Sequence, residues 1–221
     1  MIKAVIFDMD GLMFDTERLM MLAWDYAGEK MGLGKTGHMV LKTLGMNRIL
    51  SREVWKEEYG EVFKAEELDL YTNEFFEHYY SENDVPVKTG LYELLSYLRE
   101  HHYKIGAASS TYIEKVKHHL NNAKILEYFD VVVGGDMVEK SKPDPQIYQK
   151  ASELLGVKPD SCYALEDSRN GLLAAYRAGC KPIMIPDLWQ PDEEISRILY
   201  AKRNNLSEVI DILKDNHNNN C

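Results

Sequence analysis

The feature that most constrains this chain is a short apolar run near the N-terminus that ends in two carboxylates and a glycine. Ala4 to Phe7 are apolar and include β-formers, which favours a buried strand over a helix. Asp8 and Asp10 follow, and Gly11 permits a tight or left-handed turn as the chain leaves the strand. If strand pairing continued to Asp10, both carboxylates would point to the same side. Such close carboxylates repel each other unless a cation joins them or one takes a proton, so we expect a charged site here.

Length and composition indicate a globular protein with a substantial core. The 221 residues suffice for one large domain or for a core domain with a smaller insertion, and 45% of them are apolar. A formal net charge of −10 leaves no basic surplus, so we expect no general nucleic-acid binding. The three cysteines are far apart and lack metal-ligand spacing, which predicts free thiols in a reducing compartment. No apolar run approaches the ~18 residues of a membrane span, so we predict a cytoplasmic protein without membrane contact.

The remainder of the chain divides into an all-helical part and an alternating part. Residues 16–85 carry helix signals and no convincing strand. From residue 90 onward, helices alternate with apolar strands, which we expect at 103–108, 129–133, 162–165 and 181–185. This alternation predicts an α/β fold, a Rossmann-like parallel sheet core with helices on both faces. We expect residues 1–15 and 86–221 to form the core and residues 16–85 to form a small all-helical domain inserted after the first strand.

Polar residues follow the ends of several predicted strands. In a parallel sheet, ligands bind beyond the carboxyl ends of the strands, so these residues should meet at one edge. They are Asp8 and Asp10 after the first strand, Ser109 and Ser110 after the second, Lys142 in a loop after the third, and Glu166 and Asp167 after the fourth. The four carboxylates would bring up to four negative charges together, and such hard oxygen ligands suit Mg²⁺. We therefore predict a Mg²⁺ site made by Asp8, Asp10, Glu166 and Asp167.

The remaining polar groups at this edge predict a site for phosphate. Lys142 supplies a movable positive charge, and Ser109 supplies a hydroxyl at a strand-to-helix junction, where the first helical amides lack partners. We expect Ser109, Ser110 and Lys142 to bind the phosphate of a small phosphorylated metabolite. In phosphoryl transfer, the protein mainly positions groups and offsets charge. We assign Asp8 as the nucleophile that forms an acyl phosphate and Asp10 as the acid/base.

These residues also carry a family resemblance. Asp8-Met-Asp10-Gly11, Ser109, Lys142 in Ser-Lys-Pro-Asp-Pro, and Glu166-Asp167-Ser168 resemble the four motifs of the haloacid dehalogenase superfamily, in order. Within it, the chain resembles the β-phosphoglucomutase-like phosphatases, whose helical cap domain is inserted just after the first motif. The resemblance implies a Rossmann-like core, Mg²⁺ dependence and attack by the first aspartate. It also implies that the metal is bound by Asp8, the Asp10 backbone carbonyl and the Glu166/Asp167 pair.

The resemblance also separates possible activities. True dehalogenases of the superfamily lack the second aspartate, so Asp10 argues against dehalogenation. β-Phosphoglucomutase has a histidine where this chain has Met20, and residues 70–76 offer no counterpart of its cap lysine. We therefore predict a Mg²⁺-dependent phosphatase for small phosphomonoesters, a sugar phosphate or a nucleotide, with a hexose phosphate mutase as the alternative. Arg48 is predicted either to contact substrate or to form a surface ion pair.

A non-catalytic binding protein is a third class to consider. Such a protein would be expected to carry a broken motif, and none of the four motifs is broken here. The sequence therefore favours an enzyme, which we expect to be a monomer or a weak oligomer.

Overall fold

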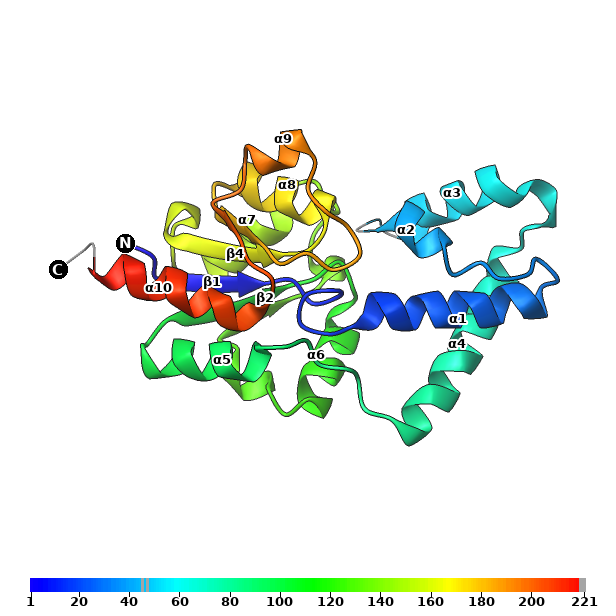
Figure 1. The fold of residues 1–221 in the computed structure, drawn as a ribbon, viewed down its shortest axis with the longest axis horizontal. Helices are drawn as coiled ribbons and strands as arrows, with labels where there is room; N and C mark the ends of the chain where they lie inside the picture. The colour runs from blue at the N-terminus through cyan, green and yellow to red at the C-terminus, as the bar shows by residue number, and fades with distance from the viewer. Residues whose placement is uncertain (45, 47, 219–221) are drawn as a thin grey trace.

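A single parallel sheet forms the centre of the molecule. The computed structural model describes residues 1–44, 46 and 48–218. The sheet has six strands in the order β3-β2-β1-β4-β5-β6, all paired in parallel. Figure 1 labels β1 and the two strands that pair with it, β2 and β4. The strands are β1 (Ala4–Phe7), β2 (Lys104–Ala108), β3 (Val131–Val133), β4 (Cys162–Glu166), β5 (Lys181–Met184) and β6 (Ala201–Lys202). The chain winds outward in both directions from the β1–β4 pair, so a ligand-binding crevice is expected beyond the carboxyl ends of these two strands.

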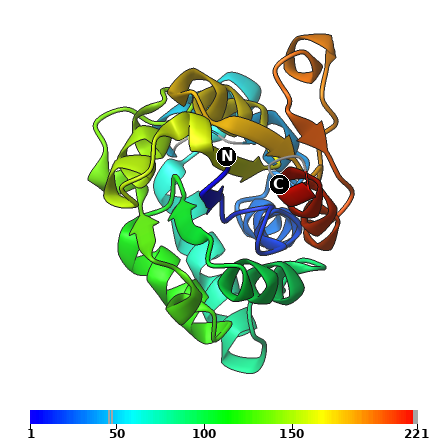
Figure 2. The same cartoon turned by 90° about the vertical axis from the view of Figure 1, so that its left-hand side faces the viewer.

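Strand β1 is buried on both faces because it lies between two strands and between two layers of helices. All four of its residues are completely buried. Its side chains alternate: Val5 and Phe7 join one hydrophobic cluster, and Ala4 and Ile6 join another. The first cluster lies under α5 (Leu91–Glu100), α6 (Ile113–Asn122) and α10 (Val209–Asn218), and the second under α7 (Gln146–Leu154) and α8 (Arg169–Ala178) (Figure 2). The predicted α/β class with helices on both faces is confirmed.

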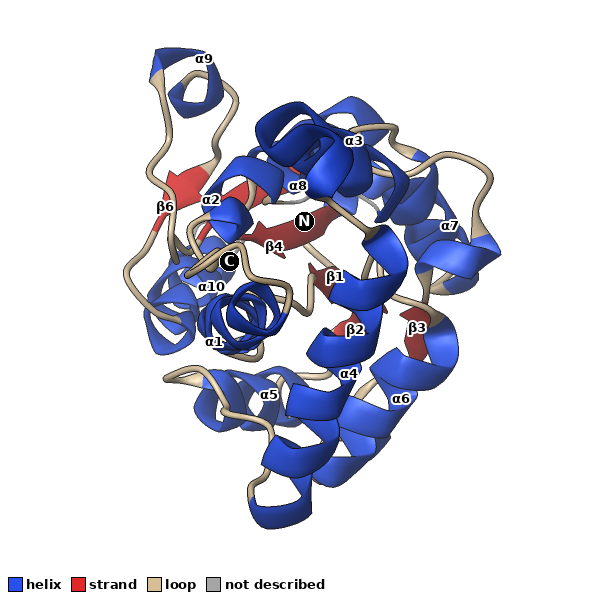
Figure 3. Cartoon of the chain, turned by 90° about the vertical axis from the view of Figure 1, so that its right-hand side faces the viewer, coloured by secondary structure: helices blue, strands red, loops and turns tan. Residues whose placement is uncertain are grey.

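Residues 16–82 lie to one side of the sheet (Figure 1) and, within the described positions, contain helices but no strand (Figure 3). The helices are α1 (Thr16–Lys30), α2 (Met39–Thr43), α3 (Arg48–Tyr59) and α4 (Ala65–Glu82). They enclose a separate hydrophobic cluster around the completely buried Trp55. This helical segment therefore has a core of its own, distinct from the two clusters that cover the sheet.

The two chain segments that connect the helical segment to the sheet run side by side. Phe14 and Val87 form an antiparallel bridge. The Asp15 amide donates to the Pro86 carbonyl at 2.8 Å, and the Lys88 amide donates to the Met13 carbonyl at 2.9 Å. The two covalent connections of the helical segment therefore lie together, next to the carboxyl end of β1.

Some small elements carry too little sequence pattern to be predicted. Strand β6 has two residues and pairs with Ile183 and Met184 at the edge of the sheet. Helix α9 (Glu193–Ser196) is a single turn that Asp192 caps by accepting from the Ile195 amide. Short 3₁₀ turns lie at Gly60–Val62, Leu126–Tyr128, Gly135–Met137, Pro159–Ser161 and Leu206–Glu208. Among the described helices, none combines the length and apolar character needed to cross a membrane.

Candidate active site

The two opening aspartates are placed by a turn rather than by strand alternation. Pairing with β4 reaches only the Asp8 amide, which donates to the Leu165 carbonyl at 3.0 Å. The chain then turns through Gly11, which has a φ of +78°. A Cβ on Gly11 would lie 2.3 Å from Asp167 Oδ2, so both the backbone conformation and the lack of space require glycine. The first and fourth motifs are therefore in direct contact.

Lys142 reaches the centre of the site from the loop before α7. Its Nζ donates to Asp8 Oδ1 at 2.5 Å, to Glu166 Oε1 at 2.6 Å and to the Ala108 carbonyl at 3.0 Å. The side chain is 3% exposed. Burial lowers the pKa of Lys142, but the charges of Asp8 and Glu166 outweigh that effect, so the pKa is raised and the ammonium group stays charged.

Asp8, Glu166 and Asp167 form a buried acidic cluster. One carboxylate oxygen from each residue lies within 4.8 Å of the others. Burial, and after it the charge of Glu166, raise the pKa of Asp8 to about 8, and burial together with the charge of Asp8 raises the pKa of Asp167 well above its usual value. Asp167 Oδ1 is buried and has no hydrogen-bond partner in the described structure. These hard oxygen donors, one of them unpaired, fit a divalent cation such as Mg²⁺.

Glu166 differs from Asp167 because both of its oxygens already have protein partners. Its Oε1 accepts from Lys142 and, at 2.5 Å, from the Tyr148 hydroxyl, and its Oε2 accepts from the Ser168 hydroxyl at 3.2 Å. A Cβ on Gly171 would lie 1.9 Å from Glu166 Oε1, so α8 packs directly against this carboxylate. Glu166 therefore orients Lys142 within the cluster, in addition to its predicted role as a metal ligand.

Asp10 is held by hydroxyl groups from two parts of the chain. Thr16 Oγ1 donates to Asp10 Oδ1 at 2.9 Å, and Thr111 Oγ1 donates to Asp10 Oδ2 at 2.8 Å. Thr16 directly before Glu17, and Thr111 three residues before Glu114, have sequence positions typical of helix caps. In the structure the capping positions of α1 and α6 are instead Asp15 and Tyr112, neither of which makes a side-chain capping bond. The completely buried Ser109 accepts from the Thr111 amide at 3.0 Å and lies 3.5 Å from Asp10 Oδ2. Asp10 is thus oriented in part by Ser109 and Thr111, which lie at the end of β2, where phosphate binding was predicted.

Two further residues belong to the site but carry no sequence signal that identifies them. Tyr148 is completely buried, donates to Glu166, and has Lys142 Nζ 5.2 Å from its ring centre. Glu17 lies beside Gly11, and its pKa is raised to about 8 by burial and by the charges of Asp10 and Asp187. A tyrosine three residues after a proline at a helix start, and a glutamate in a first helical turn, are both ordinary in sequence. Only the folded chain brings them to the acidic cluster.

Two of the predicted substrate-binding residues lie outside this cluster of contacts. Ser110 is exposed, and its carbonyl is close to Gly135, where an added Cβ would lie 2.2 Å away. Arg48 forms an ion pair with Asp69 on α4, and its side chain is 65% exposed. Arg48 thus makes the surface ion pair that was one of its two predicted roles, and its contact with substrate stays a prediction.

Fold and site together define an α/β enzyme with an acidic centre, a buried lysine and a helical segment attached beside them. The sequence model of the haloacid dehalogenase-like hydrolase family matches residues 5–185. The chain is 32% identical over 181 residues to a phosphorylated carbohydrates phosphatase from Thermotoga maritima, covering 82% of this chain and 83% of that protein. It is 31% identical over 183 residues to β-phosphoglucomutase from Bacillus subtilis (strain 168), covering 80% of each protein.

A solved structure agrees with these relatives. The crystal structure of CbbY from Rhodobacter sphaeroides in complex with phosphate superposes with a TM-score of 0.78 at 26% identity, covering 95% of this chain and 96% of that chain. The chain belongs to the haloacid dehalogenase-like hydrolases, in the β-phosphoglucomutase-like subfamily. It is a phosphoric monoester hydrolase, as the sequence predicted.

Proposed function

We propose that this chain is a Mg²⁺-dependent phosphatase that hydrolyses small phosphomonoesters through an aspartyl phosphate on Asp8. The observation that supports this most is the pairing of Lys142 with Asp8 beside the unpaired Asp167 oxygen. A nucleophile, a counter-charge and a metal-binding oxygen then lie at the switch point of the sheet. The oxygens of Asp8, Glu166 and Asp167 and the backbone carbonyl of Asp10 would hold Mg²⁺. When bound, the ion would offset the negative charge of the phosphate and of the carboxylates.

The reaction requires two bond exchanges at phosphorus. In the first, an oxygen of Asp8 bonds to phosphorus, the bond from phosphorus to the ester oxygen breaks, and Asp10 gives its proton to the leaving alkoxide. In the second, Asp10 takes a proton from water, the water oxygen bonds to phosphorus, and the bond to Asp8 breaks to release phosphate. Thr16 and Thr111 donate to opposite oxygens of Asp10, which supports a fixed orientation of this carboxyl group during proton transfer.

The phosphate needs donors as well as the cation. We propose that Lys142, Ser109 and Ser110 bind its oxygens. Lys142 is buried and charged, and Ser109 lies at the carboxyl end of β2 next to Asp10. The contact of Lys142 with Asp8 supports a role of the ammonium group in offsetting the charge that develops on a phosphoryl group at Asp8.

The helical segment would control access to this centre. We propose that residues 16–85 form a cap on a core of residues 1–15 and 86–221, and that the paired linkers at Phe14 and Val87 act as the hinge. A cap that closes over bound substrate would exclude water and select the leaving group. The separate hydrophobic cluster of the helical segment supports its movement as one body.

The substrate is proposed to be a sugar phosphate, with a nucleotide as the broader possibility. The resemblance to a phosphorylated carbohydrates phosphatase favours the sugar phosphate. A mutase remains the second candidate because one relative is β-phosphoglucomutase. A mutase and a phosphatase are distinguished by their products. When the enzyme is mixed with β-glucose 1-phosphate and a trace of bisphosphate, a mutase yields glucose 6-phosphate, whereas a phosphatase yields inorganic phosphate.

The test is phosphate release from a panel of metabolite phosphates and p-nitrophenyl phosphate, with Mg²⁺ and with EDTA. The proposal predicts release that requires Mg²⁺ and falls by about 10⁴-fold or more in Asp8→Asn, because the amide cannot replace the nucleophile. Asp211→Asn changes an exposed aspartate of α10 in the same way and should keep full activity. Full activity of Asp8→Asn would contradict the assignment of the nucleophile.

A further inference from the structure

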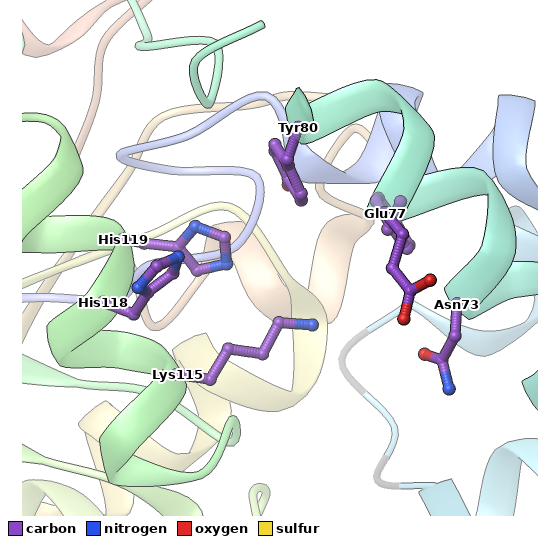
Figure 4. Close-up of a pocket in the computed structure, with 7 residues that line it drawn as sticks. Asn73, Glu77, Tyr80, Lys115, His118 and His119 are labelled. Carbon is purple, nitrogen blue, oxygen red and sulfur yellow. The ribbon is translucent and has the colours of Figure 1, made fainter. Parts of the chain in front are cut away.

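A cleft separates the helical segment from the sheet-covering helix α6. Its volume is about 340 Å³, which is within the range of small-molecule sites. Three of its residues come from α6 and four from α4 (Figure 4). The lining residues are Asn73, Phe76, Glu77, Tyr80, Lys115, His118 and His119. None of these residues belongs to the acidic cluster of Asp8, Glu166 and Asp167.

The cleft begins next to Asp10. The ring of the buried His119 lies 5.9 Å from the ring of Tyr80 and 5.9 Å from that of Phe14, the residue bridged to Asp10. Burial, and after it the charge of Asp10, raise the pKa of Tyr80 to about 12. Burial lowers the pKa of His119, and Asp10 opposes this effect. Both side chains therefore lie within electrostatic range of the proposed acid/base, where the leaving group of a substrate would extend.

The walls of the cleft combine aromatic rings with both hydrogen-bond donors and acceptors. Phe76 and Tyr80 are partly buried and stacked, with ring centres 5.6 Å apart. Lys115 extends toward Glu77 and Asn73 across the cleft (Figure 4). Lysine donates only, glutamate accepts only, and asparagine does both. Apolar ring faces beside mixed donors and acceptors suit a chain or ring of hydroxyl groups, which presents C–H surface and needs both kinds of partner.

The charges in the cleft argue against a second phosphate group. The seven described lining residues include one lysine, one glutamate, two histidines and no arginine, and burial lowers the pKa of one of these histidines, His119, which favours its neutral form. Recognition of a phosphate normally uses several cations or the two-pronged guanidinium of arginine. Here a second phosphate would meet Glu77 as well as Lys115, so attraction and repulsion would largely cancel. Arg48, which forms an ion pair with Asp69, is not among the residues that line the cleft.

We propose that this cleft binds an uncharged polyhydroxyl leaving group, so that the enzyme prefers sugar or sugar-alcohol monophosphates to sugar bisphosphates. Glu77 and Lys115 bind hydroxyl groups from opposite sides, and Phe76 and Tyr80 pack against the carbon chain. The proposal rests on the proposed phosphatase function and adds to it the residues that choose the substrate.

The test compares steady-state kinetics on glucitol 6-phosphate, fructose 1,6-bisphosphate and p-nitrophenyl phosphate. Wild-type enzyme should show a higher kcat/KM for glucitol 6-phosphate than for the bisphosphate. Glu77→Gln and Lys115→Met should each raise KM for glucitol 6-phosphate by about 10-fold, because each replaces a charged hydrogen-bonding group, while kcat/KM for p-nitrophenyl phosphate stays within about 2-fold. Glu66→Gln, an exposed glutamate of α4 outside the cleft, should change neither value.

The outcomes separate this inference from the function on which it rests. No phosphate release from any monoester would contradict the phosphatase function itself. Release of phosphate with the bisphosphate preferred, or with Glu77→Gln and Lys115→Met indistinguishable from Glu66→Gln on glucitol 6-phosphate, would overturn the leaving-group site and leave the phosphatase function intact. Loss of activity on all three substrates alike would also overturn it, because a leaving-group site must affect the substrates unequally.

Discussion

Replacing Lys142 with methionine should destabilise the metal-free protein. The ammonium group contacts Asp8 at 2.5 Å and Glu166 at 2.6 Å, and the side chain is 3% exposed. Lys142→Met keeps most of the side-chain volume but removes the charge. It leaves two buried carboxylates close together with their shared counter-charge gone, and water cannot replace that charge without opening the site.

The size of the effect follows from this geometry. Breaking a buried ion pair by removing one partner costs about 3–5 kcal/mol, because the other charge stays buried. Two carboxylates lose their partner here, but either can take up a proton, so we retain the range for a single pair. In a protein of this size, 1 kcal/mol corresponds to about 2–4 °C in Tm. The expected fall in Tm is therefore about 6–20 °C, taking 3 kcal/mol at 2 °C and 5 kcal/mol at 4 °C as the limits.

Thermal unfolding followed by circular dichroism at pH 8 in EDTA measures this loss. Lys117→Met is the matched control, because Lys117 is half-exposed and its 3.8 Å pair with Glu114 is worth less than about 1 kcal/mol. The double variant Asp8→Asn/Lys142→Met should lose less stability than the sum of the single variants, because the amide needs no counter-charge. A Tm of Lys142→Met within about 2 °C of wild type would refute the argument, since that shift is no more than ~1 kcal/mol.

Three other predictions concern the same site. Asp167→Asn should raise the Mg²⁺ concentration for half-maximal phosphate release by at least about 10–100-fold, because it removes a metal ligand; an unchanged Mg²⁺ dependence would contradict this. Metal-free protein should lose stability as the pH rises from 5 to 8, seen as a falling urea midpoint. The pKa values of Asp8 and Glu17 are raised to about 8 in the folded protein, so between pH 5 and pH 8 both carboxyl groups keep protons that they have already lost in the unfolded chain. A urea midpoint that rises with pH would contradict this prediction. Tyr148→Phe should lower the free energy of unfolding by about 1 kcal/mol, the net value of one hydrogen bond, and leave Lys142 as the remaining partner of Glu166 Oε1; equal urea midpoints would exclude that bond.

The parts of the fold that the sequence predicts are those with strong local patterns. Buried strands such as 162–165 stand out as apolar runs that end in polar residues, and the structure has β4 at Cys162–Glu166. Edge strand β6 has no such run, because its two residues gain their conformation only by pairing with β5. Its existence depends on tertiary contact, which periodicity cannot report.

The same distinction applies to the site. Asp8, Lys142 and Asp167 are predictable because Asp8 and Asp167 directly follow strands, Lys142 lies in a loop, and each belongs to a recognisable motif. The structure brings all three together. Thr16 and Thr111 have the spacing of helix caps, but their hydroxyls donate to Asp10, which lies close only after the sheet has formed. Local capping bonds and long-range bonds use the same hydroxyl, and sequence alone cannot tell which one prevails.

The most direct test of the proposed mechanism is to quench the enzyme during turnover of a phosphoryl-labelled substrate and to map the labelled residue by peptide mass spectrometry. The proposal predicts label on Asp8 in the wild type and none in Asp8→Asn. Turnover with no label on the protein, or with the label on another residue, would contradict Asp8 as the nucleophile.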